Sequence, residues 1–404
     1  MRAWRLHSQQ PLGEEKVPLR LEEVPLPVPG PGEVRLRVEA CGVCHTDLHI
    51  AEGELPAAHL PLTPGHQVVG IIDAIGPRTP AAAGGGAPAA APGAALTGAP
   101  AAASLTETAG GLEIGRRVGL TWLYSACGGC RFCRSGLENL CQNARFTGLH
   151  VDGGFAEYVI APVDFVIPLP PELGAAPEVA PLLCAGMIGY RSLKVAGVRP
   201  GETIGLIGFG ASAHLVIQVL RHWGCTVFVF TRSEKHRQLA RRLGAAWAGG
   251  LDETPADRPG SAWPAGGRPG WPGGDRPARD RPAGDRRGGG LDAGICDRVI
   301  SFAPVGAVIP RALALTRPGG TVAINAVHLD KVPEFPYPLL WRERTLRSVA
   351  NVTRQDAYEF IELVRTAHLR AEVEVFPFEA LPEALLALKQ ARVQGAPVLL
   401  VGAR

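Results

Sequence analysis

The amino-acid sequence lacks a long apolar run. In its 404 residues, no apolar stretch reaches membrane-spanning length without interruption by charge, Pro or Gly, whereas a spanning helix needs about 20 such residues. The opening residues, Met1 to Leu6, also lack the apolar segment of a secretion signal. We therefore expect a cytoplasmic protein with no membrane partner.

A strong excess of charge is missing as well. The formal net charge is +3 at pH 7, which is close to balance for this length and indicates no polyanionic partner. The sequence therefore gives no reason to expect nucleic-acid binding. Its length is sufficient for two domains with sizeable cores.

Two segments contain few large apolar residues. Residues 78–111 are mostly Ala, Pro and Gly, and residues 254–290 are mostly Pro, Gly, Arg and Asp. Neither segment can bury enough apolar surface to offset the entropy of ordering it. We interpret both as surface-loop insertions.

Cysteine, in contrast, is abundant, with nine residues in the chain. Four of them share one short loop with the spacing C-x2-C-x2-C-x7-C, namely Cys127, Cys130, Cys133 and Cys141. Four thiolates in a tetrahedral set favour zinc, and such a closed shell leaves no position for a substrate. The loop therefore predicts a structural zinc site.

Other interpretations of this loop have less support. A disulfide pair would require an oxidising compartment. An iron–sulfur cluster usually ends its close-spaced run with three residues, Cys and Pro, whereas here seven residues separate the last two cysteines and Gln142 follows. A zinc ribbon that binds nucleic acid would normally lie in a more basic and aromatic setting.

The pattern of apolar residues changes along the chain. Residues 34–40 alternate with period two, as in a half-buried strand, and further short strands follow up to Ile167. After Pro200, strands and helices alternate, which indicates a doubly wound parallel sheet. Its strands are expected at 203–209, 226–230, 297–302, 321–325 and 345–349, with a turn at Gly319–Gly320; a helix at 356–364 and a last strand at 396–401 follow.

The first strand of the parallel sheet leads directly into a Gly-rich turn. Gly208, Gly210 and Ala213 form the pattern G-x-G-x-x-A between a strand and a helix. Gly208 permits the tight turn, Gly210 lets the backbone approach a pyrophosphate, and Ala213 lets the helix pack on the sheet, while the helix N-terminus attracts phosphate. The pattern predicts a dinucleotide-binding site.

The end of the second strand departs from the usual NAD pattern. An Asp or Glu normally accepts hydrogen bonds from the ribose there, but this chain has Thr231, Arg232 and Ser233. A guanidinium and two hydroxyls could hold a 2′-phosphate. We therefore expect NADP to be preferred over NAD.

Three further stretches are rich in residues that ligate metals. They are Cys41-Gly-Val-Cys44-His-Thr-Asp-Leu-His49, Pro64-Gly-His66-Gln-Val-Val-Gly70 and Ala180-Pro-Leu-Leu-Cys184-Ala-Gly186. With the cysteine loop and the Gly-rich turn, they stand in the order of the zinc-dependent medium-chain alcohol dehydrogenase family. The chain resembles this family over nearly its whole length, apart from the two insertions.

The resemblance implies two zinc ions per subunit, one structural and one catalytic. Cys44, His66 and Cys184 would hold the catalytic ion in the Cys2His arrangement known for alcohol dehydrogenase, with an open fourth position. The zinc would act as a Lewis acid on the substrate oxygen while the nicotinamide accepts the hydride.

Residues near these ligands take roles by the same comparison. Thr46 resembles the hydroxyl that takes the alcohol proton and passes it through the cofactor ribose toward His49. His45 stands where the family has a basic contact to the pyrophosphate. Asp47 resembles the partner that orients His66 as a ligand.

Two positions depart from the family pattern. Gln67 follows His66 where much of the family has Glu, and a neutral amide cannot serve as an alternative carboxylate ligand. Ile188 stands where many relatives carry a Thr that touches the nicotinamide, so a hydrogen bond to the cofactor is lost. Neither change removes an expected zinc ligand.

The resemblance also implies the domain organisation. Residues 1–177 and 352–404 would form a mostly β GroES-like catalytic domain, with a zinc-binding lobe at 122–145. Residues 178–351 would form the doubly wound (Rossmann) nucleotide-binding domain. Its last strand would pair with another subunit in a homodimer or homotetramer.

The expected activity is the interconversion of primary or secondary alcohols with aldehydes or ketones, linked to NAD(P). Three alternatives stay open. The chain could be a polyol dehydrogenase or a thiol-adduct formaldehyde dehydrogenase of the same superfamily, or a non-catalytic regulator that binds NADPH.

Overall fold

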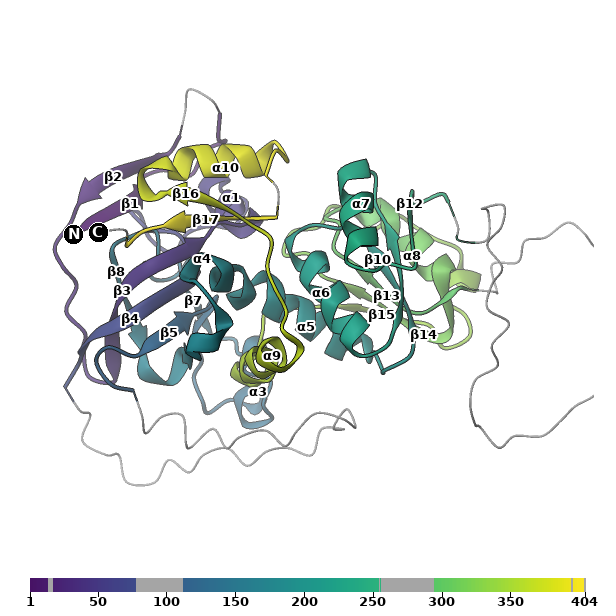
Figure 1. The fold of residues 1–404 in the computed structure, drawn as a ribbon, viewed down its shortest axis with the longest axis horizontal. Helices are drawn as coiled ribbons and strands as arrows, with labels where there is room; N and C mark the ends of the chain where they lie inside the picture. Colours follow the sequence, from purple (N-terminus) through teal and green to yellow (C-terminus); the bar gives the residue numbers. More distant parts are fainter. Residues whose placement is uncertain (14–16, 78–111, 254, 256–293, 394, 403–404) are drawn as a thin grey trace, which may run out of the picture.

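The computed structural model describes residues 1–13, 17–77, 112–253, 255, 294–393 and 395–402. The two expected insertions, 78–111 and 254–290, lie outside the described residues apart from Pro255. Figure 1 shows two lobes side by side, with helices α5 (Ala185–Ala196) and α9 (Arg354–Ala367) near their junction. Among the described residues, none of the helices has the length and apolar character needed to span a bilayer.

The first lobe is built around a seven-stranded sheet. Its order is β16-β17-β3-β4-β5-β9, with β8 also paired to β3. All of its pairs are antiparallel except β16 with β17. The strands are β3 (Glu33–Gly42), β4 (Gln67–Ile75), β5 (Arg117–Leu120), β8 (Tyr158–Pro162), β9 (Val166–Pro168), β16 (Val373–Pro377) and β17 (Ala396–Leu400).

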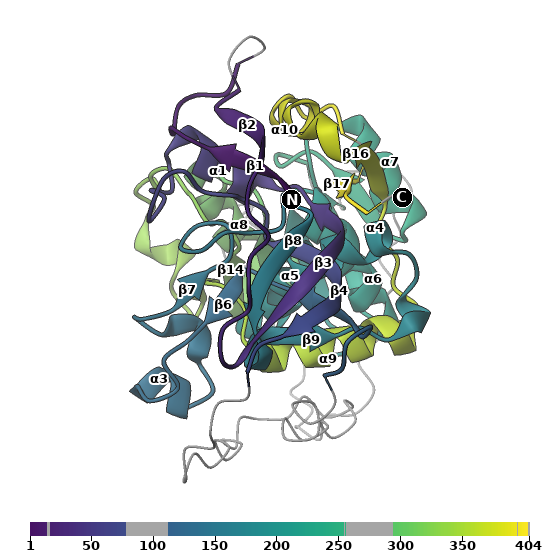
Figure 2. The same ribbon diagram turned by 90° about the vertical axis from the view of Figure 1, so that its left-hand side faces the viewer.

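Strand β3 follows the predicted alternation. Val34, Leu36 and Val38 are buried while Arg35 and Arg37 are not, so one face of the strand is directed into the core. The prediction of a half-buried strand at 34–40 is therefore confirmed. Figure 2 shows β3 and β4 crossing the centre of this lobe.

Smaller ribbons and helices complete the first lobe. Strands β1 and β2 form one antiparallel pair, and β6 and β7 form another. The elements are β1 (Arg2–Leu6), β2 (Leu19–Glu23), β6 (Leu123–Ser125), β7 (Arg145–Phe146), α1 (His45–Glu52), α3 (Arg131–Arg134), η2 (Glu138–Leu140), α4 (Ala176–Val179) and α10 (Leu381–Lys389).

The second lobe contains a six-stranded parallel sheet in the order β12-β11-β10-β13-β14-β15. Parallel strands joined by helices confirm the predicted doubly wound architecture. The elements are β10 (Thr203–Ile207), β11 (Thr226–Phe230), β12 (Trp247–Gly249), β13 (Cys296–Ser301), β14 (Thr316–Ile324), β15 (Thr345–Ser348), α6 (Ala211–His222), α7 (Glu234–Arg242) and α8 (Ile309–Leu315).

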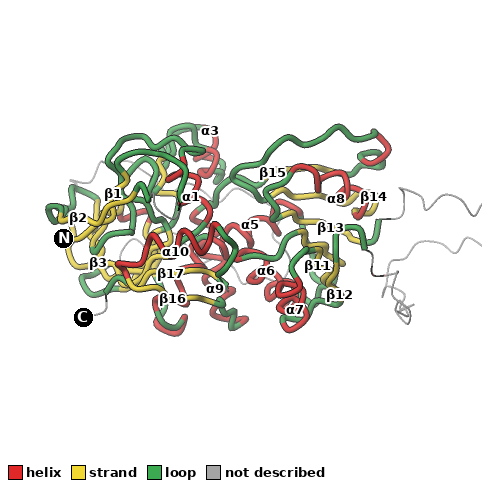
Figure 3. Tube along the Cα trace, turned by 90° about the horizontal axis from the view of Figure 1, so that it is seen from above, coloured by secondary structure: helices red, strands yellow, loops and turns green. Residues whose placement is uncertain are grey.

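The continuous apolar sequence of β11 arises because both faces of the parallel sheet are covered. Val227 and Val229 pack in the cluster that includes α5 and α6, whereas Phe228 and Phe230 pack in the cluster that includes α8. Figure 3 shows α6 and α7 on one side of the sheet and α8 on the other. A parallel strand buried on both faces needs no polar alternation.

One predicted turn is wrong. Gly319 and Gly320 were expected to precede a strand, but β14 already begins at Thr316 and runs through them. The register between β13 and β14 shifts between Cys296 and Arg298, and Gly319 has a positive φ of 73°. The two glycines therefore allow an irregularity inside a strand rather than a turn before it.

After β15 the chain returns to the first lobe. It passes through α9 and adds β16 and β17 to the first sheet, where β17 pairs with residues 40–42 of β3. The predicted helix at 356–364 and strand at 396–401 are both confirmed. The domain boundaries at 177/178 and 351/352 stay predictions.

Helix α6 buries a histidine. His214 is 1% exposed, and its Nε2 accepts a hydrogen bond from the backbone N–H of Glu372 at 3.3 Å. Burial lowers the pKa of His214 to about 4. The imidazole is therefore neutral in the folded chain over a pH range in which an unfolded histidine takes up a proton.

We expect this histidine to make the protein sensitive to acid. As the pH falls from 6.5 to 4, the unfolded chain binds a proton at His214 and the folded chain does not, so the free energy of unfolding should fall by up to about 3 kcal/mol. The variant His214→Gln keeps an acceptor and removes the titration. Urea unfolding across this pH range should therefore be less pH-dependent in the variant.

The matched control is His222→Gln, which makes the same change at an exposed position of the same helix. Its unfolding should follow the wild-type pH dependence. A pH dependence of His214→Gln parallel to the wild type would contradict the prediction.

Candidate active site

Two thiols and an imidazole from three separate stretches converge in the structure. The ligand atoms of Cys44, His66 and Cys184, called here the Cys2His cluster, all lie within 4.8 Å of one another. The Sγ of Cys44 is 3.4 Å from Nε2 of His66. Tetrahedral donors at about 2.0–2.3 Å from one zinc ion stand roughly 3.3–3.8 Å apart, so the three side chains fit a single ion.

Cys44 is positioned by the start of helix α1. It is the N-cap residue of the helix, and its Sγ accepts a hydrogen bond from the backbone N–H of Thr46 at 3.4 Å. The carboxylate of Asp47 accepts in return from the backbone N–H of Cys44 at 2.9 Å. This reciprocal cap fixes the direction of the thiol.

His66 is positioned by the same carboxylate. Asp47 and His66 are each 1% exposed, and Oδ1 of Asp47 lies 3.2 Å from Nδ1 of His66. The same oxygen accepts from the backbone N–H of Gly65 at 3.2 Å. In the neutral imidazole that a metal ion requires, a proton on Nδ1 facing Asp47 leaves the lone pair of Nε2 on the side of the ring nearest Cys44.

The cluster carries an excess of negative charge. Burial lowers the pKa of His66, but the charges of Cys44 and Asp47 outweigh it and raise that pKa to about 10. The pKa of Cys44 lies well below its usual value because Cys184 donates a hydrogen bond to its sulfur, although burial opposes this. A buried imidazole that faces two anions suits a cation, which agrees with the donor geometry.

Asp47 offers a direct test of this arrangement. In Asp47→Asn, the amide nitrogen would face either the Cys44 N–H or the Gly65 and His66 donors, so one hydrogen bond becomes a repulsive contact. We expect the Cys2His cluster to bind zinc about 10–100-fold more weakly. Competition with a chelator of known affinity would measure the change.

Asp73→Asn provides the matched control. Asp73 lies in β4 and makes an ion pair with Arg35 of β3 at 2.9 Å. It is not among the residues of the Cys2His cluster. Zinc affinity should be unchanged in this variant. Equal zinc affinity in wild type and Asp47→Asn would remove the role assigned to the carboxylate.

The other residues expected at the site lie on the same helix. Thr46 is buried in the first turn of α1, and His45 beside it is exposed. The Nδ1 atom of His49 contacts the carboxylate of Glu54 within hydrogen-bond distance, and the side chain of His49 is partly exposed. Its ring centroid is 5.8 Å from that of His328, which follows β14 in the second lobe and could not be placed from the sequence.

The Gly-rich turn has the geometry that its sequence implies. Gly208 follows β10 with a φ of 84°, a conformation that side chains rarely adopt. Gly210 is the N-cap residue of α6, and a Cβ there would meet no atom within 4 Å. Ala213 is fully buried in the core. The turn therefore presents open space at the N-terminus of a 12-residue helix.

The three residues after β11, which were all expected to face the cofactor, differ in their exposure to solvent. Arg232 is exposed, but Thr231 is buried and Ser233 is half-buried. The hydroxyl oxygen of Ser233 caps helix α7 by accepting from the backbone N–H of His236 at 3.4 Å. Among the three residues, Arg232 is therefore the one that can reach a ligand most freely.

The four-cysteine loop folds into a single cluster. The sulfurs of Cys127, Cys130, Cys133 and Cys141 all lie within 4.8 Å of one another. Cys130 caps α3 by accepting from the backbone N–H of Cys133 at 3.5 Å, and the two sulfurs are also 3.5 Å apart. All nine cysteines are free thiols, so the disulfide interpretation of the loop is not adopted.

Comparisons with known proteins agree with this geometry. Residues 30–171 match the family model described as the alcohol dehydrogenase GroES-like domain. A probable alcohol dehydrogenase, AdhA, from Mycobacterium tuberculosis is 37% identical over 402 residues, which cover 99% of this chain and 97% of the relative. The chain belongs to the zinc-dependent medium-chain alcohol dehydrogenase family.

Other similar alcohol dehydrogenases and related enzymes extend this finding. An alcohol dehydrogenase from Geobacillus stearothermophilus is 31% identical over 392 residues, covering 96% of this chain and 97% of the relative. The solved structure of acetophenone reductase from Geotrichum candidum in complex with NAD has a TM-score of 0.73 and 26% identity, covering 99% and 96% of the two chains. The predicted GroES-like and Rossmann fold and the alcohol dehydrogenase activity are thereby confirmed.

The two departures from the family pattern can now be located in this alcohol dehydrogenase. Gln67 is a buried residue at the start of β4, and a Cβ on Gly42 would lie 2.5 Å from its Oε1. Ile188 is half-buried in the first turns of α5, four residues after Cys184. Neither residue is among the three donors of the Cys2His cluster.

Proposed function

We propose that this enzyme interconverts primary or secondary alcohols with aldehydes or ketones at a zinc ion held by Cys44, His66 and Cys184. The observation that carries the proposal is the convergence of these donors within 4.8 Å. Three protein donors leave the fourth tetrahedral position for substrate oxygen. A zinc ion bound there would supply Lewis-acid polarisation of that oxygen.

The residues of the chain hold and complete this site. Asp47 keeps the proton of His66 on Nδ1, so that Nε2 is available as a donor. We assign to the Thr46 hydroxyl a relay role, in which it accepts the substrate proton while giving its own toward the cofactor ribose, and to His49 the final transfer of a proton to solvent. The burial of Thr46 next to Cys44 and the partial exposure of His49 beside Glu54 support this order.

The hydride partner is proposed to be a nicotinamide dinucleotide, with NADP preferred over NAD. Support comes from the open Gly208–Gly210 turn and from exposed Arg232 after β11, where no carboxylate stands. His45 would contact the pyrophosphate. Initial rates with both cofactors decide the preference, and a large advantage for NAD would remove it.

The cysteine lobe is proposed to hold a second, structural zinc ion. Its four sulfurs form a closed donor set that leaves no position for a substrate. The two clusters together give an expected content of two zinc ions per chain. We propose a reducing compartment such as the cytoplasm, because cysteines that ligate zinc must stay out of disulfides.

Assembly into a homodimer or homotetramer is proposed to use the edge of the parallel sheet. Strand β15 is the last strand in the order of that sheet. The segment before it exposes large aromatic side chains, with Tyr337 65% exposed and Trp341 56% exposed. An unpaired edge next to exposed aromatic surface is suited to a partner subunit.

The proposal is tested by metal content together with a substrate panel. Purified protein should contain two zinc ions per chain and oxidise some members of a series of short, branched and aromatic alcohols with NADP or NAD. A protein that binds zinc and NADPH but transfers no hydride would instead support the regulator.

A further inference from the structure

The segment between β15 and α9 contacts both the cysteine lobe and the surroundings of the Cys2His cluster. Asn351 lies in this segment with a φ of 53°, a left-handed conformation that Asn tolerates better than most residues. Its Nδ2 donates to the backbone carbonyl of Asn139 at 3.2 Å, and its Oδ1 accepts from Nε1 of Trp122 at 3.0 Å. One amide therefore joins two parts of the chain.

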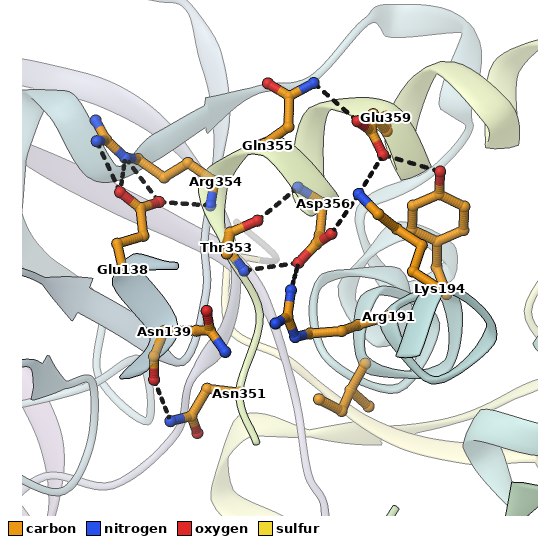
Figure 4. Close-up of polar contacts among 12 residues, drawn as sticks. Glu138, Asn139, Arg191, Lys194, Asn351, Thr353, Arg354, Gln355, Asp356 and Glu359 are labelled. Atoms are coloured by element: carbon orange, nitrogen blue, oxygen red, sulfur yellow. Dashed lines mark hydrogen bonds and ion pairs between the residues drawn. The ribbon is translucent and has the colours of Figure 1, made fainter. Parts of the chain in front are cut away.

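On the side of the cysteine lobe, several hydrogen bonds hold this connection. Asn139 donates through Nδ2 to the carbonyl of Ala350 at 2.7 Å. Its neighbour Glu138 pairs with the guanidinium of Arg354 at 2.8 Å and accepts from the backbone N–H of Arg354 at 2.7 Å. Figure 4 shows the pairing of Glu138 with Arg354 and the hydrogen bond between Asn139 and Asn351. The side-chain amide of Asn351 is thus anchored through its Nδ2, and the backbone on either side of it is held at Ala350 and Arg354.

The other side of the connection reaches His66 through an aromatic ring. The indole of Trp122 meets the imidazole of His66 edge-on, with ring centroids 5.1 Å apart and an interplanar angle of 74°. Its opposite neighbour is Phe146, stacked at 5.0 Å. The backbone carbonyl of Trp122 is held by the N–H of Thr147 at 2.9 Å.

The rotation of the Trp122 ring depends on the hydrogen bond that its indole N–H donates. Backbone contact and stacking on Phe146 fix where the ring lies, and the hydrogen bond to Asn351 fixes how it is turned. On one side Asp47 holds His66 at 3.2 Å. The Trp122 ring packs against the same imidazole, so that rotation of the indole would change the direction of Nε2.

We propose that Asn351 is a positioning residue for the metal site, acting on His66 through Trp122. This inference rests on the proposed function in one respect, because the Cys2His cluster must bind a metal ion. Loss of the Asn351 side chain would let the indole turn, loosen the imidazole and weaken its hold on the ion, although Asn351 itself touches none of the three donors.

The test uses cobalt as a spectroscopic probe of the Cys2His cluster. The visible spectrum of tetrahedral Co²⁺ with thiolate ligands changes with ligand geometry, and subtracting the spectrum of Cys44→Ser removes the contribution of the lobe. Asn351→Gly permits the left-handed backbone and removes both hydrogen bonds. Trp122→Phe keeps an aromatic ring, removes the N–H donor and puts a single ring of smaller volume in place of the bicyclic indole.

Both single variants should alter the cobalt spectrum and speed the loss of Co²⁺ to a chelator by about tenfold. In the double variant, Asn351→Gly should speed the loss of Co²⁺ by less than about twofold beyond the effect of Trp122→Phe. The reason is that Asn351 acts on His66 only through Trp122, so the two effects are not additive. Gln355→Ala is the matched control, since it removes a side-chain amide from the first turn of α9. Within the described part of the chain, this amide hydrogen-bonds to Glu359 and not to Trp122 or Asn139. The spectrum of Gln355→Ala should equal that of the wild type.

The outcomes separate this inference from the proposed function. If the wild-type cluster binds no Co²⁺, the proposed function fails. If the wild type binds Co²⁺ but both single variants keep its spectrum and rate of loss, the inference fails and the function stands. A full effect of Asn351→Gly in the Trp122→Phe background would also overturn it. Should Asn351→Gly not fold, an unchanged spectrum of Trp122→Phe alone would overturn it.

Discussion

Cys44→Ser should contain one zinc ion per chain instead of two, and its kcat should be lower than that of the wild type by about a thousandfold or more. A Lewis-acid metal supplies several kcal/mol of transition-state stabilisation, and each 1.4 kcal/mol is about a factor of ten in rate. A serine hydroxyl is a much poorer zinc ligand than a thiolate, so the Cys2His cluster would lose its ion.

Cys44→Ser should test the role of the metal ion alone, because the substitution leaves the local fold intact. Cys44 is the N-cap residue of α1, and Ser is among the residues that cap helices best. Cys41→Ser is the matched control, since Cys41 is fully buried three residues earlier in β3 and is not among the donors. Zinc content and steady-state rates of both variants give the answer. Two zinc ions in Cys44→Ser, or one in Cys41→Ser, would contradict the assignment of the ligand.

Cys130→Ser should lose the other zinc ion and chiefly weaken folding or assembly. Binding of a structural zinc ion contributes directly to folding free energy, by about 10 kcal/mol or more in small domains. Here the lobe is only part of a larger fold, so we expect Tm to fall by about 5–10 °C. The cap of α3 would again be preserved by Ser.

Zinc content, thermal unfolding and size-exclusion chromatography measure this effect. Cys225→Ser is the matched control, because Cys225 is a half-buried thiol outside both clusters. Its zinc content and oligomeric state should be those of the wild type. A Cys130→Ser protein with two zinc ions and an unchanged Tm would show that the lobe does not depend on a metal.

Local patterns predicted much of the fold. The period-two alternation of β3 and the strand–turn–helix order around Gly208 are visible over short windows, because each depends on neighbours in sequence. The irregular start of β14 was missed, since two adjacent glycines favour a turn when only the neighbouring residues are considered. The strand is instead defined by pairing with distant segments, with β13 at Thr316 and again from Thr321, and with β15 from Thr321.

The two metal clusters were not equally predictable from the sequence. The close spacing of the four lobe cysteines indicates a metal cluster by itself. The proximity of Cys184 to Cys44 does not follow from any spacing, and only the family resemblance suggested it. The contact of Trp122 with Asn351 joins residues 229 positions apart and depends on a left-handed backbone at Asn351, so no local signal could have indicated it.

The pairing of β17 with β3 has a consequence for how the protein is made. Residues 398–400 lie beside residues 40–42, and the backbone N–H of Val43 donates to the carbonyl of Pro397 at 2.9 Å. The loop that delivers Cys44 therefore gains its neighbouring strand only after the ribosome has added residues 396–400. A nascent polypeptide stalled before that point could load metal into the cysteine lobe while still lacking the support for its reactive centre.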